Sequence, residues 1–497
     1  MKSQRKTGVL LSYFNFTVSI LGNLLLTPAL IACLGDVQYS LYQVMRSLGG
    51  TLLLFNLGVS SIVARSIARS QALNDPREKQ NALAIGMILS VVLAAIVGAA
   101  SLVFRSCIPL LYHARFNASM LHTAQQVFGL FAAASICHIL TDAFSGCLLG
   151  HEHFAANALV VTFKYALRFG LLFGYIRTGA GLPAIARVDL IVAASALVCL
   201  AVYALLVLRE RPKLTGISKA DLRHMFVFSF AVLLQEAVNQ LNTHMDPILL
   251  DWLKTDASVI TMYSSALMIY SLYHQLVSMI GGYYLARASV LVARSASGSE
   301  MTDMLIKPGR FQAMLALGVI AGFALFGRRF IGLWIGNAYM DAYGVVLLLI
   351  IPALIPLVQS AALSILDAQF RRMMRSAMLL LATVVNVLLS LLLIRRFGPW
   401  GAATGTAVSI LLGHGWLMNR YYARTLGLEI GRLFREIFVP VLPPALLTIL
   451  LCLPLLFLPC TWLAFVFQCS SFLLLYAALL WRCSRNFQNE RMTSDGI

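Results

Sequence analysis

Three cationic side chains lie inside apolar stretches of this sequence, where a charge is costly. Arg46 lies about eight residues into the apolar stretch 38–64, and Lys164 and Arg168 lie near the middle of the stretch 155–177. A charged residue inside a membrane-spanning helix commonly marks a substrate or ion path. Lys164 and Arg168 are four residues apart and therefore share one helix face. Such cations could bind a diphosphate, and the planar fork of arginine suits contacts with two oxygens.

These cations also have structural explanations. Lys164 or Arg168 could extend to a membrane interface, since long basic side chains carry an apolar stem. Either could instead pair with an acid such as Glu236 or Asp142. The sequence leaves both alternatives open.

The stretch 224–252 is the most polar of the apolar stretches. Its polar side chains repeat at i+4, i+3 and i+4, and a carboxylate stands beside this stripe. Amide and carboxylate groups suit sugar hydroxyls, and a buried carboxylate could carry a coupling proton or Na⁺. The alternative is that these groups join neighbouring helices, or that the last of them caps a helix end. The predicted sugar or ion-coupling residues are Gln235, Glu236, Asn239, Asn242 and Asp246, with Asn15 and Asn23 on an opposite wall.

Metal and cofactor chemistry has little support in the sequence. The histidines His138, His274 and His414 are scattered, and the segment 151–153 offers too few ligands for a zinc site. None of the nine cysteines forms a CxxC pair. No P-loop sequence occurs, and the connections between apolar stretches reach only about 23 residues, too short for a catalytic domain. We therefore expect that the protein is not an enzyme and that it binds no metal and no cofactor beyond a coupling H⁺ or Na⁺.

The elements that must position these residues are membrane-spanning helices. The chain is 60% hydrophobic and 12% charged, with a mean hydropathy of +0.82. A spanning helix needs roughly 20 apolar residues, and fourteen stretches meet this length. The sequence therefore predicts an all-α polytopic membrane protein. The predicted spans are 7–33, 38–64, 81–104, 124–149, 155–177, 188–208, 224–252, 258–285, 309–335, 344–366, 376–394, 400–422, 435–457 and 461–481.

The distribution of charge predicts the orientation. With the N-terminus placed in the cytoplasm, 26 of the 38 Lys and Arg residues fall at the inner ends and nine at the outer ends. This excess fits the positive-inside rule with both termini cytoplasmic. The net charge of +18 is then explained by anionic headgroups. We expect no nucleic-acid partner, because that would need a basic soluble domain.

The chain contains an internal repeat. Thr27-Pro28 is followed six residues after the proline by Leu34, and Asp246-Pro247 is followed at the same distance by Leu253. Six spans separate the copies, which predicts a parallel repeat about an axis along the membrane normal. The prolines either bend their helices or end them. The predicted division is a six-helix bundle in 1–208, a second in 209–425, and two additional helices in 426–497.

The order of several motifs resembles the bacterial polysaccharide (O-antigen, Wzx-type) flippases. The motifs are Thr27-Pro28, Leu34-Gly35-Asp36, Tyr39-Ser40-Leu41-Tyr42, Asn56-Leu57-Gly58, Leu333-Trp334-Ile335-Gly336, Asn386 and Phe397-Gly398-Pro399-Trp400-Gly401-Ala402-Ala403-Thr404-Gly405-Thr406. The resemblance covers roughly residues 5–425. It places the chain in the MOP superfamily, with the drug/cation (MATE) antiporters and the lipid II flippase.

The resemblance implies a function and a set of partners. It implies that an undecaprenyl-diphosphate-linked oligosaccharide moves from the cytoplasmic to the outer leaflet by alternating access. The partners implied are this glycan and membrane lipids, with polysaccharide polymerase and glycosyltransferase machinery as further candidates. Fourteen helices are nearer to the lipid II flippase, and the last two would then form a groove for the polyprenyl tail. The competing hypotheses are a MATE-like antiporter for small organic cations, which would favour acids over intramembrane cations, and a non-transporting assembly protein.

Overall fold

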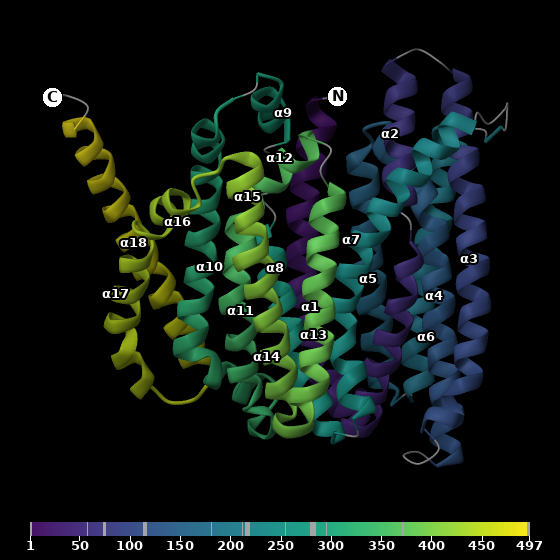
Figure 1. The fold of residues 1–497 in the computed structure, drawn as a ribbon. Helices are drawn as coiled ribbons and strands as arrows, with labels where there is room; N and C mark the ends of the chain where they lie inside the picture. Colours follow the sequence, from purple (N-terminus) through teal and green to yellow (C-terminus); the bar gives the residue numbers. More distant parts are fainter. Residues whose placement is uncertain are drawn as a thin grey trace. The chain divides into compact units, whose positions relative to one another are not determined.

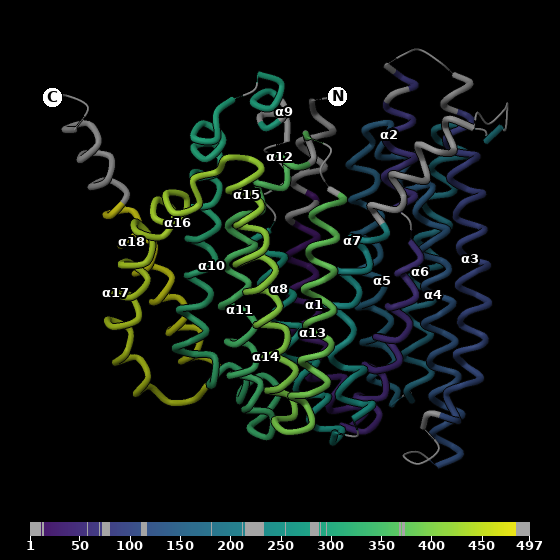
Figure 2. Tube along the Cα trace, viewed as in Figure 1, coloured from purple at the N-terminus to yellow at the C-terminus, as the bar shows by residue number. Residues whose placement is uncertain are grey.

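The computed structural model consists of helices and their connections, with no strand among the residues that it describes (Figure 1). The described residues are 2–56, 58–72, 76–112, 117–179, 181–210, 212–213, 219–253, 255–278, 285–294, 296–369 and 372–494. The chain divides into two compact units, Met1–Thr261 and Met262–Ile497. Figure 2 traces the same path by residue number.

Unit 1 holds the first seven helices and the start of the eighth. A short 3-10 turn (η1) and a π-helical turn (η2) interrupt the α-helices. The elements are α1 (Lys2–Thr51), η1 (Leu52–Phe55), α2 (Val59–Ala72), α3 (Pro76–Tyr112), α4 (Ala118–Gly150), α5 (Phe154–Arg177), α6 (Leu182–Val202), η2 (Tyr203–Val207), α7 (Lys219–Trp252) and α8 (Ala257–Ser278), which crosses into unit 2.

Unit 2 holds the remaining helices. One of its membrane segments also contains a π-helical portion (η5). The elements are α9 (Leu285–Ala293), α10 (Gly298–Trp334), η4 (Asn337–Tyr339), α11 (Ala342–Val358), α12 (Ala362–Ala368), α13 (Arg372–Phe397), α14 (Pro399–Ile410), η5 (Leu411–Met418), α15 (Asn419–Leu426), α16 (Ile430–Phe438), α17 (Leu442–Cys452), η6 (Leu453–Phe457) and α18 (Trp462–Ser494).

The helices confirm a polytopic membrane protein. Nine segments of the described chain are long and apolar enough to cross a membrane. The first of them, Phe14–Ala68, covers two of the predicted spans. Every other predicted span overlaps a helix of the described residues, although α7, α8, α11 and α14 are not among the nine, and α11 is a shorter apolar helix. The division into six-helix bundles around a pseudo-twofold axis stays a prediction.

A glycine, not the nearby proline, interrupts the first helix. Pro28 lies inside α1, and the helix continues to Gly35, whose φ of 66° is favourable mainly for glycine. Pro247 likewise lies inside α7, which continues to Trp252. The alternative in which these prolines end their helices is therefore wrong. The same holds for Asp246 as a cap of the helix end.

The last two membrane segments pack on α10 (Figure 1). Leu317, Ala321 and Phe326 of α10 share one apolar core with α17 and α18. On α18, Phe472 meets Phe326 edge to face at 6.2 Å, and the Tyr476 hydroxyl donates to the carbonyl of Met314 at 2.9 Å. The additional helices are thus part of the hydrophobic core of unit 2.

The family-like glycine motif joins α13 to α14. A Cβ atom on Gly401 would lie 2.4 Å from the backbone of Leu393, and one on Gly405 would lie 2.4 Å from the Ser390 hydroxyl. The hydroxyl of Thr406 donates to Oδ1 of Asn386 at 3.3 Å. Small residues let two membrane helices approach closely, and a buried amide can join them. The motif therefore has a packing explanation.

Gly146 makes a similar close contact between α4 and α2, and it gives a stability prediction. A Cβ atom there would lie 2.4 Å from the carbonyl oxygen of Ser60 and 2.9 Å from its Cα. Because the backbone of Ser60 cannot move aside as a side chain can, the new methyl group would be strained. We therefore expect Gly146→Ala to lower the free energy of unfolding by about 1–3 kcal/mol. Gly170 of α5 is the control, because a Cβ there meets nothing within 4 Å. Thermal melting in detergent should show a lower transition for Gly146→Ala alone; equal transitions would contradict the prediction.

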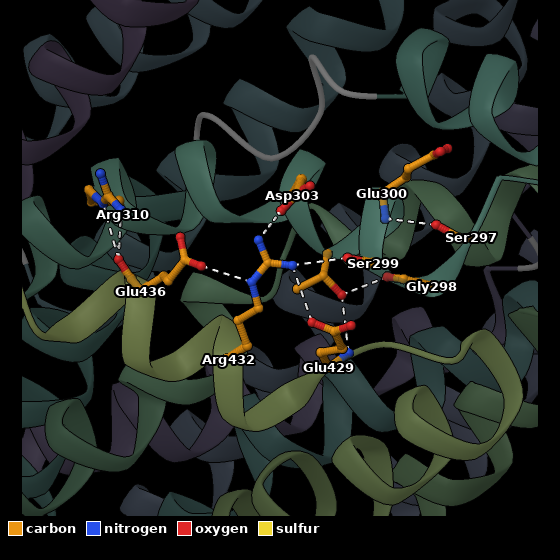
Figure 3. Close-up of polar contacts among 10 residues, drawn as sticks. Ser297, Gly298, Ser299, Glu300, Asp303, Arg310, Glu429, Arg432 and Glu436 are labelled. Carbon is orange, nitrogen blue, oxygen red and sulfur yellow. Dashed lines mark hydrogen bonds and ion pairs between the residues drawn. The ribbon is translucent and has the colours of Figure 1, made fainter. Parts of the chain in front are cut away.

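Arg432 on α16 connects this helix to the start of α10 (Figure 3). Its guanidinium contacts Glu436 on its own helix at 2.8 Å and Asp303 on α10 at 2.7 Å. It also contacts Glu429 at 3.2 Å and the hydroxyl of Ser299 at 3.0 Å. One arginine thus joins two helices that are about 130 residues apart in the sequence.

Removing this connection should loosen α16 without changing the rest of unit 2. We expect Arg432→Gln to speed hydrogen–deuterium exchange of segment 427–438 severalfold, because local opening then breaks fewer contacts. Arg435→Gln is the matched control, since this side chain is exposed on the same helix. Mass spectrometry of the exchanged peptides measures the effect. Unchanged exchange in Arg432→Gln would show that apolar packing alone holds the helix.

Candidate functional site

Arg168 is held in a triangle of three side chains from three helices of unit 1. Its Nε donates to Oδ1 of Asp189 on α6 at 2.8 Å. Its Nη2 donates to the hydroxyl of Tyr42 on α1 at 3.3 Å, and this hydroxyl donates to Oδ2 of Asp189 at 3.0 Å. The side chains of Arg168 and Asp189 are only 14% and 17% exposed. The acid that pairs with Arg168 is therefore neither Glu236 nor Asp142.

Lys164 lies one turn from Arg168 on α5 but has different neighbours. The positive charge of Lys164 interacts electrostatically with Asp142 and His138 of α4. Asp142 accepts a hydrogen bond from the amide of Asn56, the residue that follows η1. Within the described residues, the Lys164 side chain forms no ion pair and no hydrogen bond. The Lys164 side chain is half-buried. The carboxylate of Asp142 interacts with its charge without forming an ion pair.

Arg46 is the most accessible of the three predicted cations. Its side chain is exposed, whereas its neighbours Met45 and Ser47 are buried. The positive charge of Arg46 interacts electrostatically with Asp189, with Tyr42 and with His244 of α7. No ion pair of Arg46 occurs within the described part of the chain. All three cations thus belong to one polar region of unit 1.

The polar stripe of α7 reaches the same region. A Cβ atom on Gly50 of α1 would lie 2.6 Å from Nε2 of His244, so the imidazole lies directly against the backbone of α1. Toward the other end of the stripe, Glu236 is half-buried, and its carboxylate interacts electrostatically with that of Asp142. Gln235 donates to Oδ1 of Asn239 at 3.0 Å. Helix α7 therefore brings a carboxylate and amides toward α1 and α4.

The remaining predicted residues differ in exposure. Asn242 is half-buried, whereas Asp246 is 2% exposed. In α1, Asn23 is half-buried and donates to the carbonyl of Ser19 at 2.9 Å, one turn away. Neither the role of Asn242 nor that of Asn23 follows from these contacts. Asp246 is therefore enclosed by protein.

Asn15 has a structural explanation. Its amide nitrogen donates to the carbonyl of Ala158 on α5 at 2.8 Å, and its amide oxygen accepts from the hydroxyl of Thr162 at 2.5 Å. The side chain is 7% exposed. These bonds fasten α1 to α5, which carries Lys164 two residues after Thr162.

Sequence reasoning missed Asp189 and Tyr42. Asp189 is the one acid in an otherwise apolar segment, 188–208, and an intramembrane acid is itself a sign of function. Tyr42 was read only as part of a motif. It is 1% exposed, and its ring meets Phe131 at 5.5 Å. Aromatic packing therefore fixes the hydroxyl that completes the triangle.

The region carries charges of both signs but no metal site. Within the described residues, no group of three or more His, Cys, Asp or Glu side chains is placed to hold a metal ion. The nine cysteines, all of which lie in the described part of the chain, form no disulfide with one another. What the arrangement offers chemically is anion binding by exposed or half-buried cations, with carboxylates and amides alongside.

Comparison with known proteins identifies the family. Residues 5–292, more than half of the chain, match the family described as "Polysaccharide biosynthesis protein". No curated protein matches the sequence.

Solved structures share the fold at low sequence identity. The lipid II flippase MurJ, in an inward closed conformation, has a TM-score of 0.68 and 12% identity, covering 98% of this chain and 99% of that one. An inward-facing multidrug resistance MATE family transporter of the MOP superfamily has a TM-score of 0.64 and 15% identity, covering 83% and 95%. A MOP superfamily transporter from Pyrococcus furiosus has a TM-score of 0.57 and 16% identity, covering 85% and 96%. These relatives are transporters and flippases, not enzymes. The chain is thus a multi-pass membrane protein of the polysaccharide biosynthesis protein family, with the fold of MOP superfamily transporters.

Proposed function

We propose that this protein translocates an undecaprenyl-diphosphate-linked oligosaccharide from the cytoplasmic to the outer leaflet of a bacterial inner membrane by alternating access. The observation that carries the proposal is the cationic region of unit 1, in a chain of the polysaccharide biosynthesis protein family. A lipid-linked glycan has an anionic diphosphate and a polar head, which lose their hydration in hydrocarbon. A protein that carries it must offer cations and hydrogen-bonding groups inside the membrane.

Arg46 and Lys164 are the residues proposed to bind the diphosphate first. Neither has an ion-pair partner in the described part of the chain, and both lie within helices. In this proposal the amides Gln235, Asn239 and Asn242 of α7 contact the sugars. Glu236 or Asp246 carries the coupling H⁺ or Na⁺, and both chain termini lie in the cytoplasm.

Leaflet exchange tests the proposal directly. The purified chain is placed in proteoliposomes with a fluorescent undecaprenyl-diphosphate oligosaccharide, and the fraction reached by an external glycosidase is followed with time. We expect exchange above that of protein-free vesicles, and a loss of roughly tenfold or more in Lys164→Gln, since one charge-assisted contact contributes about 1.5–3 kcal/mol. Arg177→Gln is the control, because this arginine is exposed and lies over the ring of Phe173 at 4.5 Å.

A MATE-like antiporter for organic cations is the second candidate. The observation that favours it is the presence of Asp142, Asp189 and Glu236 in the same region, since carboxylates attract cations. The neighbouring Arg168 already binds Asp189, which argues against that role for this acid. Movement of a cationic dye driven by an imposed H⁺ or Na⁺ gradient, together with no exchange of the lipid-linked glycan, would favour the antiporter.

A further inference from the structure

The second membrane segment of unit 1 is broken between η1 and α2, and one amide side chain spans the break. Asn56 has an extended backbone, and Gly58 has a φ of 67°. The amide oxygen of Asn56 accepts from the backbone N–H of Gly58 at 3.1 Å, which satisfies a donor that the break leaves free, as a membrane interior requires. The nitrogen of the same amide donates to Oδ2 of Asp142 on α4. Asn56 thus connects the start of α2 to one carboxylate.

Asp142 lies between this break and the charges of the site. Its side chain is half-buried, the ammonium group of Lys164 on α5 attracts it, and the carboxylate of Glu236 on α7 repels it. His138 lies one turn earlier on α4 and also interacts with Lys164. Within the described residues, the other helices that pack on α4, which are α1, α2, α3 and α6, add no charged group that interacts with Asp142.

An anion at Lys164 would change the charge balance at Asp142. It would neutralise the ammonium charge that favours the carboxylate, and it would place further negative charge beside the carboxylate. Because Glu236 already repels Asp142, a proton taken from solvent would relieve the repulsion. By linkage, the anion and the proton then each favour the binding of the other. A neutral Asp142 would hold the amide of Asn56 less tightly, since hydrogen bonds to a charged group are the stronger ones.

We propose that Asp142 is a proton-operated link between the anion site at Lys164 and the break that begins α2. The inference rests on the proposed function, in which Lys164 binds the diphosphate. It adds a residue and a direction: anion binding draws a proton to Asp142, and the protonated acid releases Asn56 and the start of α2. Glu236 makes no hydrogen bond to Asn56 in the described residues, so a proton on Glu236 does not reach the break in this way.

Hydrogen exchange at the start of α2 tests the link without a ligand. Peptides that cover residues 58–64 of the purified full chain in detergent are followed by mass spectrometry from about pH 8 to about pH 5. After correction for the intrinsic exchange rate, we expect exchange in the wild type to become roughly fivefold faster toward low pH. Asp142→Asn should exchange fast at every pH, because its side chain is always neutral. Glu236→Gln is the matched control and should keep the slow wild-type exchange at high pH.

Proton uptake on binding tests the ligand-linked step. Calorimetric titrations with farnesyl diphosphate at neutral pH, repeated in buffers of different ionisation enthalpy, count the protons that are taken up. We expect up to about one proton per bound probe in the wild type, and none beyond the probe's own protonation in Asp142→Asn. Asn56→Ala should keep the wild-type proton uptake although the start of α2 already exchanges fast. This variant separates the proton site from the segment it controls, and it keeps the test decisive if Asp142→Asn does not fold.

Three results would overturn the inference. The first is equal exchange of residues 58–64 in the wild type and Asp142→Asn at every pH. The second is equal proton uptake in these two proteins, and the third is a loss of protection in Glu236→Gln as large as that in Asp142→Asn. If the wild type exchanges the lipid-linked glycan and binds farnesyl diphosphate but gives any of these results, only the role of Asp142 is wrong. If the wild type neither exchanges the glycan nor binds farnesyl diphosphate, the proposed function is wrong and the inference falls with it.

Discussion

Arg46→Ala is expected to lower leaflet exchange by at least about tenfold while leaving the protein folded. The side chain is exposed within an otherwise buried segment of α1, and the described residues give it no ion pair, so its removal breaks no internal contact of this kind. If it binds the diphosphate, the loss of a charge-assisted contact should lower exchange by at least about tenfold. The measurement is the initial rate in proteoliposomes at limiting substrate, with folding checked by thermal melting.

Arg187→Ala is the matched control for Arg46. Arg187 is an exposed arginine of the same unit, near the start of α6, and its Nε donates only to the carbonyl of Pro183 at 3.3 Å. It should retain the wild-type exchange rate. A wild-type rate in Arg46→Ala, or an equal loss in both variants, would remove Arg46 from the site.

Arg168→Ala, unlike Arg46→Ala, is expected to lower the stability of the protein. It would leave Asp189 buried with its charge unpaired, and breaking one side of a buried ion pair costs about 3–5 kcal/mol. The double variant Arg168→Ala/Asp189→Ala removes both charges and should recover most of that loss. Thermal melting of the two single variants and the double variant gives the coupling between the residues.

The double variant also separates stability from transport. If Arg168 acts only as a structural partner of Asp189, the double variant should regain both folding and exchange. If Arg168 also takes part in binding, folding should return but exchange should stay low. Additive losses in the three variants would contradict the pairing itself.

Hydropathy predicted the membrane helices well because a helix that spans a bilayer must be predominantly apolar over about 20 residues. It was less informative about where segments bend. Pro28 suggested an interruption, but a proline can remain within a membrane helix, and the break occurs at Gly35, where the backbone has a positive φ. A sequence shows which residues permit such a conformation, whereas the packing of the segments decides which of them adopts it.

The candidate site was predicted in its residues but not in its pairings. Sequence placed Lys164 and Arg168 on one helix face, which a spacing of four requires. It could not show that Arg168 meets Asp189 while Lys164 lies nearer Asp142, because that depends on how α4 and α6 rotate about their own axes. Asn15 illustrates the same limit, since the polar residue in an apolar helix bonds to Ala158 and Thr162 of a neighbouring helix.

The tight joint between α13 and α14 bears on how cargo can be inferred from sequence. The glycines at 401 and 405, with Asn386 and Thr406, are occupied with each other and with the adjoining backbone. A protein could exchange one sugar for another without altering any of them. Possession of this motif is therefore evidence of architecture, and it carries no information about which substrate is carried. If α5 and α7 contact the substrate as proposed, relatives that carry different substrates should differ in these two helices.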